Sequence, residues 1–289
     1  MQEQVKNRVL ELLKNGTVNR VLAYEKGLFD YDVTPKVFTT EEEINEKFVF
    51  NEYCSANLSK YLVKESKLDG KIAVVMKPCD TYSFNQLMAE HKIERDKVYV
   101  IGAKLEKTVD AEGNILQRCK DCKSKKFVSF DEIIGEDGEK IESGRFDLVE
   151  KLENMTADER YEFWRNELSR CIRCNACRNV CPACTCEKCI FDNPATGVDN
   201  KAPASSFEEN MFHIIRAFHV AGRCTDCGEC SRVCPEHIPL HLLNRKFIKD
   251  INELYGEYQA GESTNERNPL INYTKEDVEP SIVKERGNK

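Results

Sequence analysis

The sequence of 289 residues predicts an α+β fold made of two unlike parts. In the first part, the apolar runs IAVVM at 72–76 and VYVIGA at 98–103 enclose a segment whose apolar residues recur at helical spacing, which is the pattern of a strand–helix–strand unit with parallel strands. In the second part, a cysteine motif occurs at 171–182 and again at 224–235. We therefore expect an N-terminal α/β domain with a small parallel or mixed sheet, followed by a smaller domain built around the cysteines and carrying helical insertions.

Apolar spacing and turn residues give the expected order of elements. We expect strands at 18–24, 72–76 and 98–103, and helices at 3–14, around 57–66, after residue 78, at 156–169 and at 207–220. The polar, glycine-containing segment from residue 135 precedes the cysteines, and the chain becomes polar again beyond 254. The expected domains are thus residues 1–150, residues 151–254 and a polar tail at 255–289.

Charge and composition exclude several classes of function. The chain has 43 Lys and Arg against 50 Asp and Glu, for a formal net charge of -7, whereas tracking a nucleic-acid backbone needs clustered positive charge. The charged, amphipathic start and the absence of a long apolar run predict a cytoplasmic protein without membrane insertion. In such a protein, 15 cysteines in tight local runs indicate metal ligation rather than disulfides.

The repeated motif reads C-x2-C-x2-C-x3-C-P in both places. Three cysteines separated by two residues curl the backbone around one 4Fe-4S cubane, and the fourth cysteine leads to the other cubane. Zinc is the weaker alternative, because a zinc site usually has four ligands and lacks the third cysteine and the trailing Cys-Pro. The predicted ligands are Cys171, Cys174, Cys177 and Cys234 for cluster 1, and Cys181, Cys224, Cys227 and Cys230 for cluster 2.

This pattern predicts a bacterial-ferredoxin-like dicluster domain that transfers single electrons. All iron sites of such a cluster are bound by thiolates, so the clusters offer no vacant position for a substrate and no catalytic residue is predicted among the ligands. Arg170, Arg173 and Arg178 lie among the cysteines, where positive charge would stabilise an anionic cluster.

Seven cysteines remain outside the repeated motif. Cys79 follows a predicted parallel strand, at the end where open α/β sheets gather functional groups, and Cys119 and Cys122 form a C-x2-C pair in a polar segment. With Cys54 they could hold a third 4Fe-4S cluster; zinc, a redox dithiol or no metal are the alternatives. Cys184, Cys186 and Cys189 could form a further metal site, either a cluster with one outside ligand or a zinc knuckle. The five histidines are expected to be packed or exposed residues rather than ligands.

The chain resembles the iron-sulfur (beta) subunits of deazaflavin-linked formate dehydrogenases and hydrogenases. The N-terminal half carries the resemblance in FNEYCSANLSKYL, VVMKPCD, VYVIGA and CKDC, and the second half in CIRCNACRNVCPACTCEKC and FHVAGRCTDCGECSRVCP. The latter is also similar to small subunits of heterodisulfide reductases. The resemblance implies a subunit that works with a catalytic oxidoreductase subunit and a further carrier, such as a ferredoxin, a flavoprotein or a heterodisulfide-reductase-like subunit.

Three functional hypotheses follow from these features. The first is a non-catalytic subunit that relays electrons in a cytoplasmic anaerobic oxidoreductase complex. The second is a flavin- or deazaflavin-dependent reductase with its own N-terminal active site, although no G-x-G-x-x-G follows a strand and no flavin is predicted in this chain. The third is a redox or metal sensor, against which the acidic balance argues.

Overall fold

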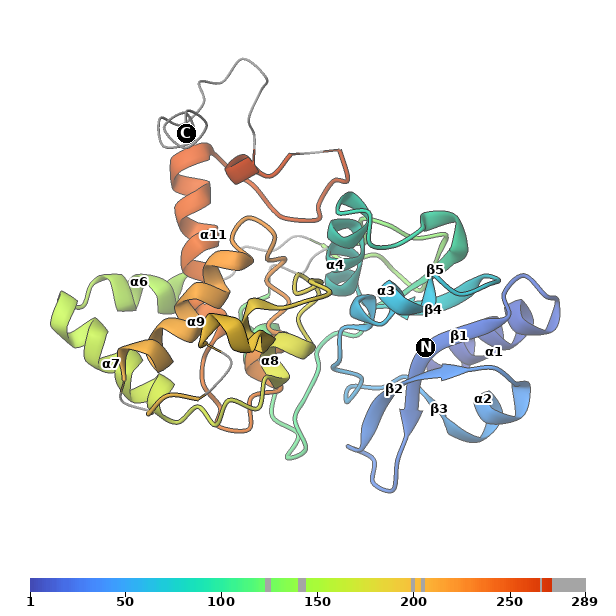
Figure 1. The fold of residues 1–289 in the computed structure, drawn as a ribbon. Coiled ribbons are helices and arrows are strands. Elements are labelled where there is room, and N and C mark those ends of the chain that lie inside the picture. The colour runs from blue at the N-terminus through green and yellow to red at the C-terminus, as the bar shows by residue number, and fades with distance from the viewer. Residues whose placement is uncertain (123–125, 140–143, 199–200, 204–205, 266, 272–289) are drawn as a thin grey trace, which may run out of the picture.

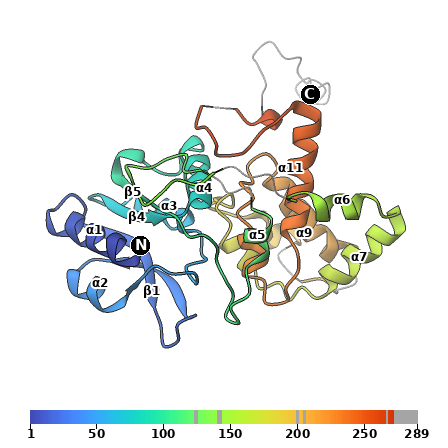
Figure 2. The same ribbon diagram turned by 180° about the vertical axis from the view of Figure 1, so that it is seen from behind.

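The computed structural model describes residues 1–122, 126–139, 144–198, 201–203, 206–265 and 267–271. Most of the tail predicted at 255–289 lies outside the described residues. Within them, the chain forms a mixed sheet with flanking helices and, beside it, a second part of helices and cysteine-rich loops (Figures 1 and 2). The α+β prediction is confirmed.

The sheet of the N-terminal part has six strands in the order β2-β1-β4-β5-β6, and β3 pairs with β1. Strands β1, β4, β5 and β6 are parallel, and β2 and β3 run antiparallel to β1. The central pairing sets Leu22 opposite Val74 and Val74 opposite Val100. The strands are β1 (Arg20–Lys26), β2 (Val33–Phe38), β3 (Phe48–Val49), β4 (Ile72–Met76), β5 (Val98–Ala103) and β6 (Glu132–Ile134).

Helices cover both faces of this sheet at its centre. All five residues of β4 are buried, which is the pattern of a parallel strand enclosed on both sides. Helix α1 (Gln2–Lys14) contributes Val5, Val9 and Leu12 to the core, and α4 (Pro78–Ala89) begins directly after β4 with Pro78 in its first turn. The carboxyl end of β4 therefore delivers Cys79 into the first turn of a helix.

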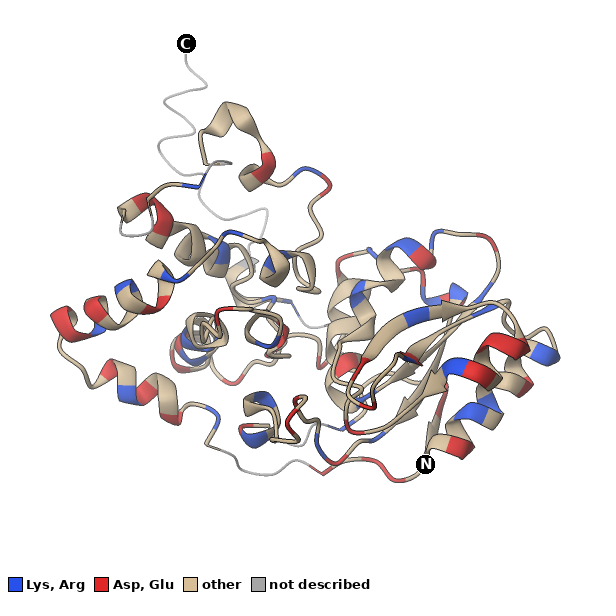
Figure 3. Ribbon diagram, turned by 90° about the horizontal axis from the view of Figure 1, so that it is seen from below, with Lys and Arg blue, Asp and Glu red and all other residues tan. Residues whose placement is uncertain are grey.

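The C-terminal part consists of helices joined by the cysteine motifs. Helix α9 packs against α7 and α11, and α6 packs against α11. Acidic and basic residues are interspersed along the helices (Figure 3). No helix among the described residues has both the length and the apolar character that a membrane span requires. The helices are α6 (Asp147–Glu153), α7 (Ala157–Ser169), α8 (Ala176–Asn179), α9 (Phe207–His219), α10 (Glu229–Arg232) and α11 (His241–Tyr255).

Four local features differ from the sequence-based expectations. The helix expected around 57–66 is divided into a 3-10 turn (Leu58–Lys60) and α3 (Leu62–Glu65), and it is preceded by α2 (Glu41–Lys47) and by β3, where Phe48 and Val49 pair with β1. Strand β2 was not expected; it carries Pro35 and lies at the edge of the sheet, where a missing N–H is tolerated. Helix α11 was not expected either, and the predicted domain boundary at residue 150 falls inside α6.

Buried ion pairs connect the two parts. Arg245 of α11 donates from Nη1 to Asp121 at 2.8 Å and from Nε to Asp226 at 2.9 Å. Arg145 donates from Nε to the other oxygen of Asp226 at 2.7 Å. Asp121 lies between Cys119 and Cys122, and Asp226 lies between the first two cysteines of the second motif. One guanidinium thus holds a loop of the N-terminal part against the cysteine-rich part.

Replacing Arg245 should destabilise the protein strongly. The Arg245→Met variant removes a buried guanidinium that pairs with Asp121 and with the 6% exposed Asp226, and breaking a buried pair in this way typically costs about 3–5 kcal/mol in the free energy of unfolding. Lys246→Met, at the neighbouring half-exposed position, is the matched control and should cost about 1 kcal/mol or less. Anaerobic urea unfolding measures both, and equal losses in the two variants would contradict the assignment.

Candidate metal centres

The backbone has the same unusual conformation in both cysteine motifs. Arg173 and Asn175 in the first motif have φ of 57° and 60°, and the equivalent Asp226 and Gly228 in the second have 58° and 70°. Left-handed conformations are uncommon for residues other than glycine. Their repetition at matching positions bends each loop around the space enclosed by its cysteines.

Backbone amides in these loops point at the cysteine sulfurs. The amide of Arg173 donates to Sγ of Cys171 at 3.3 Å. In the second motif, the amide of Asp226 donates a hydrogen bond that acts to lower the pKa of Cys224. Burial is the larger effect, and the pKa of Cys224 is raised to about 12 overall. N–H groups directed at sulfur stabilise thiolates and the clusters they bind. The loops therefore fit the anionic sulfur cage predicted from the motif.

The cysteines predicted for cluster 1 line one small cavity. Its wall combines the first motif with the last cysteine of the second motif, and Phe212, Ile238 and Leu240 close it with apolar side chains. This arrangement supports the crossed ligand assignment, which stays a prediction. The four cysteines at this cavity are Cys171, Cys174, Cys177 and Cys234.

The cysteines predicted for cluster 2 lie close enough to affect one another electrostatically. Burial, and after it the charges of Asp226 and Cys181, raise the pKa of Cys224 to about 12. Burial, and after it the charge of Cys181, raises the pKa of Cys230 to about 12 as well. Cys181 therefore lies with the second motif although it belongs to the first in sequence. The predicted set is Cys181, Cys224, Cys227 and Cys230.

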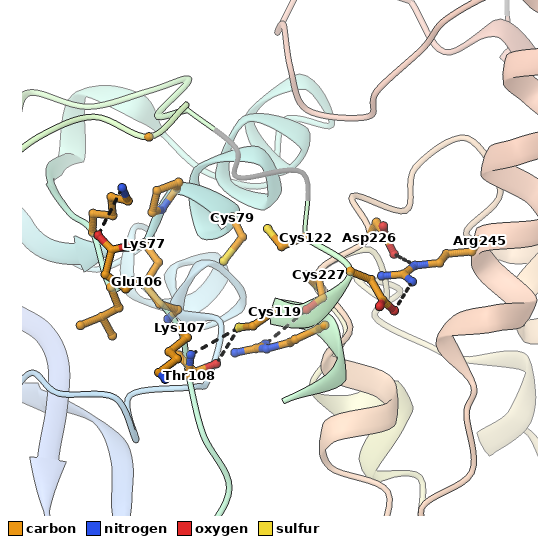
Figure 4. A pocket seen from close by; sticks show the side chains of 16 residues that line it. Lys77, Cys79, Glu106, Lys107, Thr108, Cys119, Cys122, Asp226, Cys227 and Arg245 are labelled. Atoms are coloured by element: carbon orange, nitrogen blue, oxygen red, sulfur yellow. Dashed lines mark hydrogen bonds and ion pairs between the residues drawn. The ribbon is translucent and has the colours of Figure 1, made fainter. Parts of the chain in front are cut away.

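Three of the four cysteines proposed for a third cluster share a cavity of about 130 Å³ at the carboxyl ends of β4 and β5. Figure 4 shows Cys79, Cys119 and Cys122 around this space, with Cys227 on the side toward Asp226 and Arg245. Cys119 accepts from the amide of Thr108 at 3.4 Å and lies 3.1 Å from its hydroxyl. The three thiols thus line one cavity.

Cys54 does not line this cavity. Its sulfur accepts from the amide of Asn51 at 3.3 Å and lies 3.7 Å from the carbonyl oxygen of Val49, inside the core of the N-terminal part. Burial raises the pKa of the Cys54 thiol to about 11, which favours the protonated form. The structure therefore brings together three of the four residues proposed for this site.

The run that follows the first motif lines a separate, larger cavity of about 530 Å³. Cys184, Cys186 and Cys189 contribute thiols to it, and His219 lies in the same wall. A hydrogen bond between the Cys184 and Cys181 thiols lowers the pKa of Cys181 and raises that of Cys184, so the two sulfurs share one proton more readily than either is deprotonated alone. Among the residues that the structure describes, no three His, Cys, Asp or Glu side chains are placed to hold a metal ion.

Arg118 and Glu229 are site residues that the sequence did not reveal. Arg118, buried beside Cys119, donates to Glu229, to the carbonyl oxygen of Ser55 and, at 3.2 Å, to that of Cys227. Burial would raise the pKa of Glu229, but Arg118 and Arg232 hold it at about 2, so the carboxylate stays charged. Glu229 lies within the second motif and Arg118 directly precedes Cys119, but the spacing of the cysteines does not predict a contact between them, and only the fold brings the two side chains together.

Helix α11 supports the second motif through a buried histidine. Nδ1 of His241 lies 2.8 Å from the hydroxyl of Ser231, and the amide of His241 donates to the same hydroxyl at 3.0 Å. Burial, assisted by the charge of Arg245, lowers the pKa of His241 to about 4. His241 is therefore neutral in the folded protein at neutral pH, and its predicted packing role is compatible with this position.

The crossed ligand arrangement predicts which cysteines become reactive when one is removed. In Cys234→Ser, alkylation under anaerobic conditions should increase at Cys171, Cys174 and Cys177, because their cluster loses its fourth ligand. In Cys181→Ser, the increase should occur at the three cysteines of the second motif instead. Mass spectrometric mapping of labelled cysteines, with iron content measured alongside, distinguishes the two. Reactivity that rises within the motif carrying the substitution would contradict the crossed arrangement.

His241 should make stability depend on pH. A histidine in the unfolded chain has a pKa near 6.5, so as the pH falls the unfolded state binds a proton before the folded state does. The free energy of unfolding should fall by about 1.4 kcal/mol per pH unit below about pH 6 through this residue alone. His241→Gln should remove that contribution in anaerobic urea titrations, whereas His237→Asn, at an exposed position, should keep the wild-type slope. Identical slopes for wild type and His241→Gln would contradict the prediction.

Comparisons with known proteins find one matching domain family and two similar proteins. A family model described as a 4Fe-4S dicluster domain matches residues 167–238. The F420-dependent formate dehydrogenase subunit beta of Methanocaldococcus jannaschii is 25% identical over 353 aligned positions, which cover 90% of this chain and 92% of the relative. The F420-dependent formate dehydrogenase 1 subunit beta of Methanococcus maripaludis is 25% identical over 306 positions, covering 73% of this chain and 78% of the relative.

A solved structure of the F420-reducing NiFe hydrogenase complex from Methanosarcina barkeri matches less closely. It has 17% identity and a TM-score of 0.30 over 37% of this chain and 39% of that chain, a similarity too low to support an argument. The resemblance to formate dehydrogenase beta subunits is confirmed by the two relatives. The chain is therefore similar over most of its length to the beta subunits of F420-dependent formate dehydrogenases, and its residues 167–238 match the model of a 4Fe-4S dicluster domain.

Proposed function

We propose that this chain is a non-catalytic iron-sulfur subunit that relays electrons between a formate dehydrogenase- or hydrogenase-like catalytic partner and another redox carrier, in a cytoplasmic anaerobic oxidoreductase complex. Both relatives are named as beta subunits of formate dehydrogenases, which supports a place in an oxidoreductase complex of that kind. One observation carries the proposal: Cys227, a predicted ligand of cluster 2, lines the cavity that also contains Cys79, Cys119 and Cys122. The proposed third site and the dicluster domain thus share a wall.

The two predicted clusters are also in contact through their ligands. Cys171, Cys177 and Cys230 belong to one buried apolar cluster with Leu168, Ile238 and Leu240, so ligands of both motifs pack in the same interior. Charge on Cys177 adds to the burial that raises the pKa of Cys230. The proposed order of sites is therefore the N-terminal cavity, cluster 2 and cluster 1.

The residues of this chain would hold and insulate the clusters, which supply one-electron exchange when bound. Apolar side chains such as Phe212 and Leu240 exclude water from the cavity of cluster 1. Amides such as that of Arg173 donate to sulfur, and Arg118 places positive charge beside Cys119 and Cys227. These contacts favour a bound, negatively charged cage without offering it a substrate-binding position.

The division into domains at 1–150, 151–254 and 255–289 belongs to the same proposal. In it, the N-terminal domain holds the third cluster and contacts a partner. Cys184, Cys186 and Cys189 would form an additional metal site in the cavity they line, for which an iron-sulfur cluster and zinc are both considered. Cys54 remains the proposed fourth ligand of the third site, and it lies one residue from Ser55, whose carbonyl oxygen accepts from Arg118.

The second candidate function is a flavin- or deazaflavin-dependent reductase. Two observations favour it. Both relatives are named as F420-dependent, and the cationic side chains of Lys77, Lys104 and Lys107 line the N-terminal cavity. Such side chains would attract an anionic cofactor. The relay is preferred because the thiols of the same cavity adjoin a cluster ligand.

A purified chain should distinguish these two functions. The relay predicts that its visible absorbance bleaches with dithionite, that it turns over neither deazaflavin, nicotinamide nor formate alone, and that it copurifies with a large catalytic subunit from its own cells. Turnover of deazaflavin by the isolated, iron-loaded chain would instead establish the reductase.

Iron content should report the third cluster. Anaerobically purified wild type should contain about 12 iron atoms or more per chain, counting four for each cubane. The double variant Cys119→Ser/Cys122→Ser should lose about four of them while keeping the thiols of the two motifs protected from alkylation. The Cys54→Ser variant tests whether Cys54 is the fourth ligand of this cluster: loss of the same four iron atoms would support that role. A wild-type content near eight would eliminate the third cluster.

A further inference from the structure

Arg216 is a buried cation that the proposed relay does not yet explain. It lies on α9 and is 3% exposed. Its Nη2 donates to the carbonyl oxygen of Cys177 at 2.8 Å, and its Nε has no hydrogen-bond partner. A guanidinium in the interior without a full set of partners is costly. Its position next to a predicted cluster ligand suggests what offsets this cost.

Arg216 is close to cysteines of both predicted clusters. Burial by itself would lower the pKa of its guanidinium, but the negative charge of nearby sulfurs raises it above the ordinary value. The positive charge of Arg216 in turn acts to lower the pKa of the Cys177, Cys181 and Cys230 thiols. In all three cysteines, burial acts to raise the pKa. The sulfurs that affect Arg216 are those of Cys181, Cys177, Cys230 and Cys184.

The arginines that the sequence placed among the cysteines differ from Arg216 because each has a carboxylate partner. Arg170 pairs with Glu167, Arg178 with Asp192 at 2.6 Å, and Arg173 lies 3.6 Å from Glu209. Within the described part of the chain, no ion pair with a carboxylate is found for Arg216. Its charge is therefore balanced mainly by the sulfurs.

The side chain one turn earlier on α9 does not supply this balance. His213 is 2% exposed, and neither of its ring nitrogens has a hydrogen-bond partner. Burial, and then the charge of Arg216, lower the pKa of His213 to about 3, so the ring is neutral at physiological pH. Consequently, His213 carries no charge that would alter the effect of Arg216 on the cysteines.

We propose that Arg216 is a positioning residue for electron transfer that raises the reduction potentials of both ferredoxin-type clusters, because it holds a positive charge near the cysteines of both that no carboxylate among the described residues neutralises. This inference rests on the proposed function, because it requires both clusters to be present. Each cluster gains one negative charge when it accepts an electron, and a nearby cation stabilises that reduced state. Because the charge is buried, dissolved salt screens it weakly.

The direct test compares Arg216→Gln and Arg216→Lys with wild type in potentiometric titrations monitored by electron paramagnetic resonance. Arg216→Gln should shift the midpoint potentials of both clusters to more negative values, and Arg216→Lys should recover most of the wild-type potentials. Arg170→Gln is the matched control, since it removes a cation next to Cys171 that is half-exposed and paired with Glu167. Arg170→Gln should leave the potentials close to those of wild type.

A second pair of variants serves if Arg216→Gln fails to retain iron. His213→Glu places a carboxylate one helical turn from Arg216, where it can pair with the guanidinium without removing it; because His213 also lines the cavity of cluster 1, the potential of cluster 2 is the readout that reports on Arg216. Compared with His213→Gln, it should shift both potentials in the negative direction. Iron content and visible spectra are measured for every variant, so that lost clusters are not mistaken for shifted potentials.

The outcomes separate the inference from the function on which it rests. Unchanged potentials in iron-loaded Arg216→Gln, or in His213→Glu relative to His213→Gln, would overturn the role of Arg216 while leaving the relay intact. A shift of only one cluster would likewise overturn its shared role. A wild-type chain that binds no iron-sulfur cluster would overturn the proposed function itself.

Discussion

Negatively charged sulfur in a protein interior must be offset by buried positive charge and by N–H donors, and this requirement organises much of the structure. Arg118, Arg145, Arg216 and Arg245 are all nearly or fully buried, although arginine is seldom found inside a protein without partners. Three of them pair with buried carboxylates, and the fourth lies among thiols. The interior of the C-terminal part is thus an arrangement of compensated charges as much as an apolar core.

The same charges connect distant parts of the chain. Arg118 comes from the N-terminal part and contacts Glu229 and Cys227, whereas Arg245 comes from α11 and contacts Asp121. Both contacts cross between the sheet-bearing part and the cysteine motifs. A movement of one part against the other would expose or separate buried charges, which is far more costly than breaking surface pairs. The contacts therefore hold the N-terminal cavity at a fixed place beside Cys227, a predicted ligand of cluster 2.

The sequence predicted the features that depend on local spacing. The parallel pairing of 72–76 with 98–103, the helices before and between the motifs, and the positions of the cysteines all follow from patterns of a few residues. The amphipathic pattern of Leu242, Ile248 and Ile251 would also have revealed α11. By contrast, Arg216 lies in the helix predicted at 207–220 and outside both cysteine motifs, and its role arises because α9 packs beside both motifs. Long-range electrostatic contacts of this kind leave no signal in spacing.

The arginines show most clearly why the charge balance of a site depends on the fold. Proximity in sequence favoured Arg170, Arg173 and Arg178 as the cations nearest the clusters, but each has an acidic partner, two of them from segments distant in the chain or on another helix. A charge that is paired contributes little net potential at a neighbouring site, while an unpaired one acts at full strength in a low dielectric. Reduction potentials in this chain should therefore follow the pairing of its cations rather than their number near the cysteines.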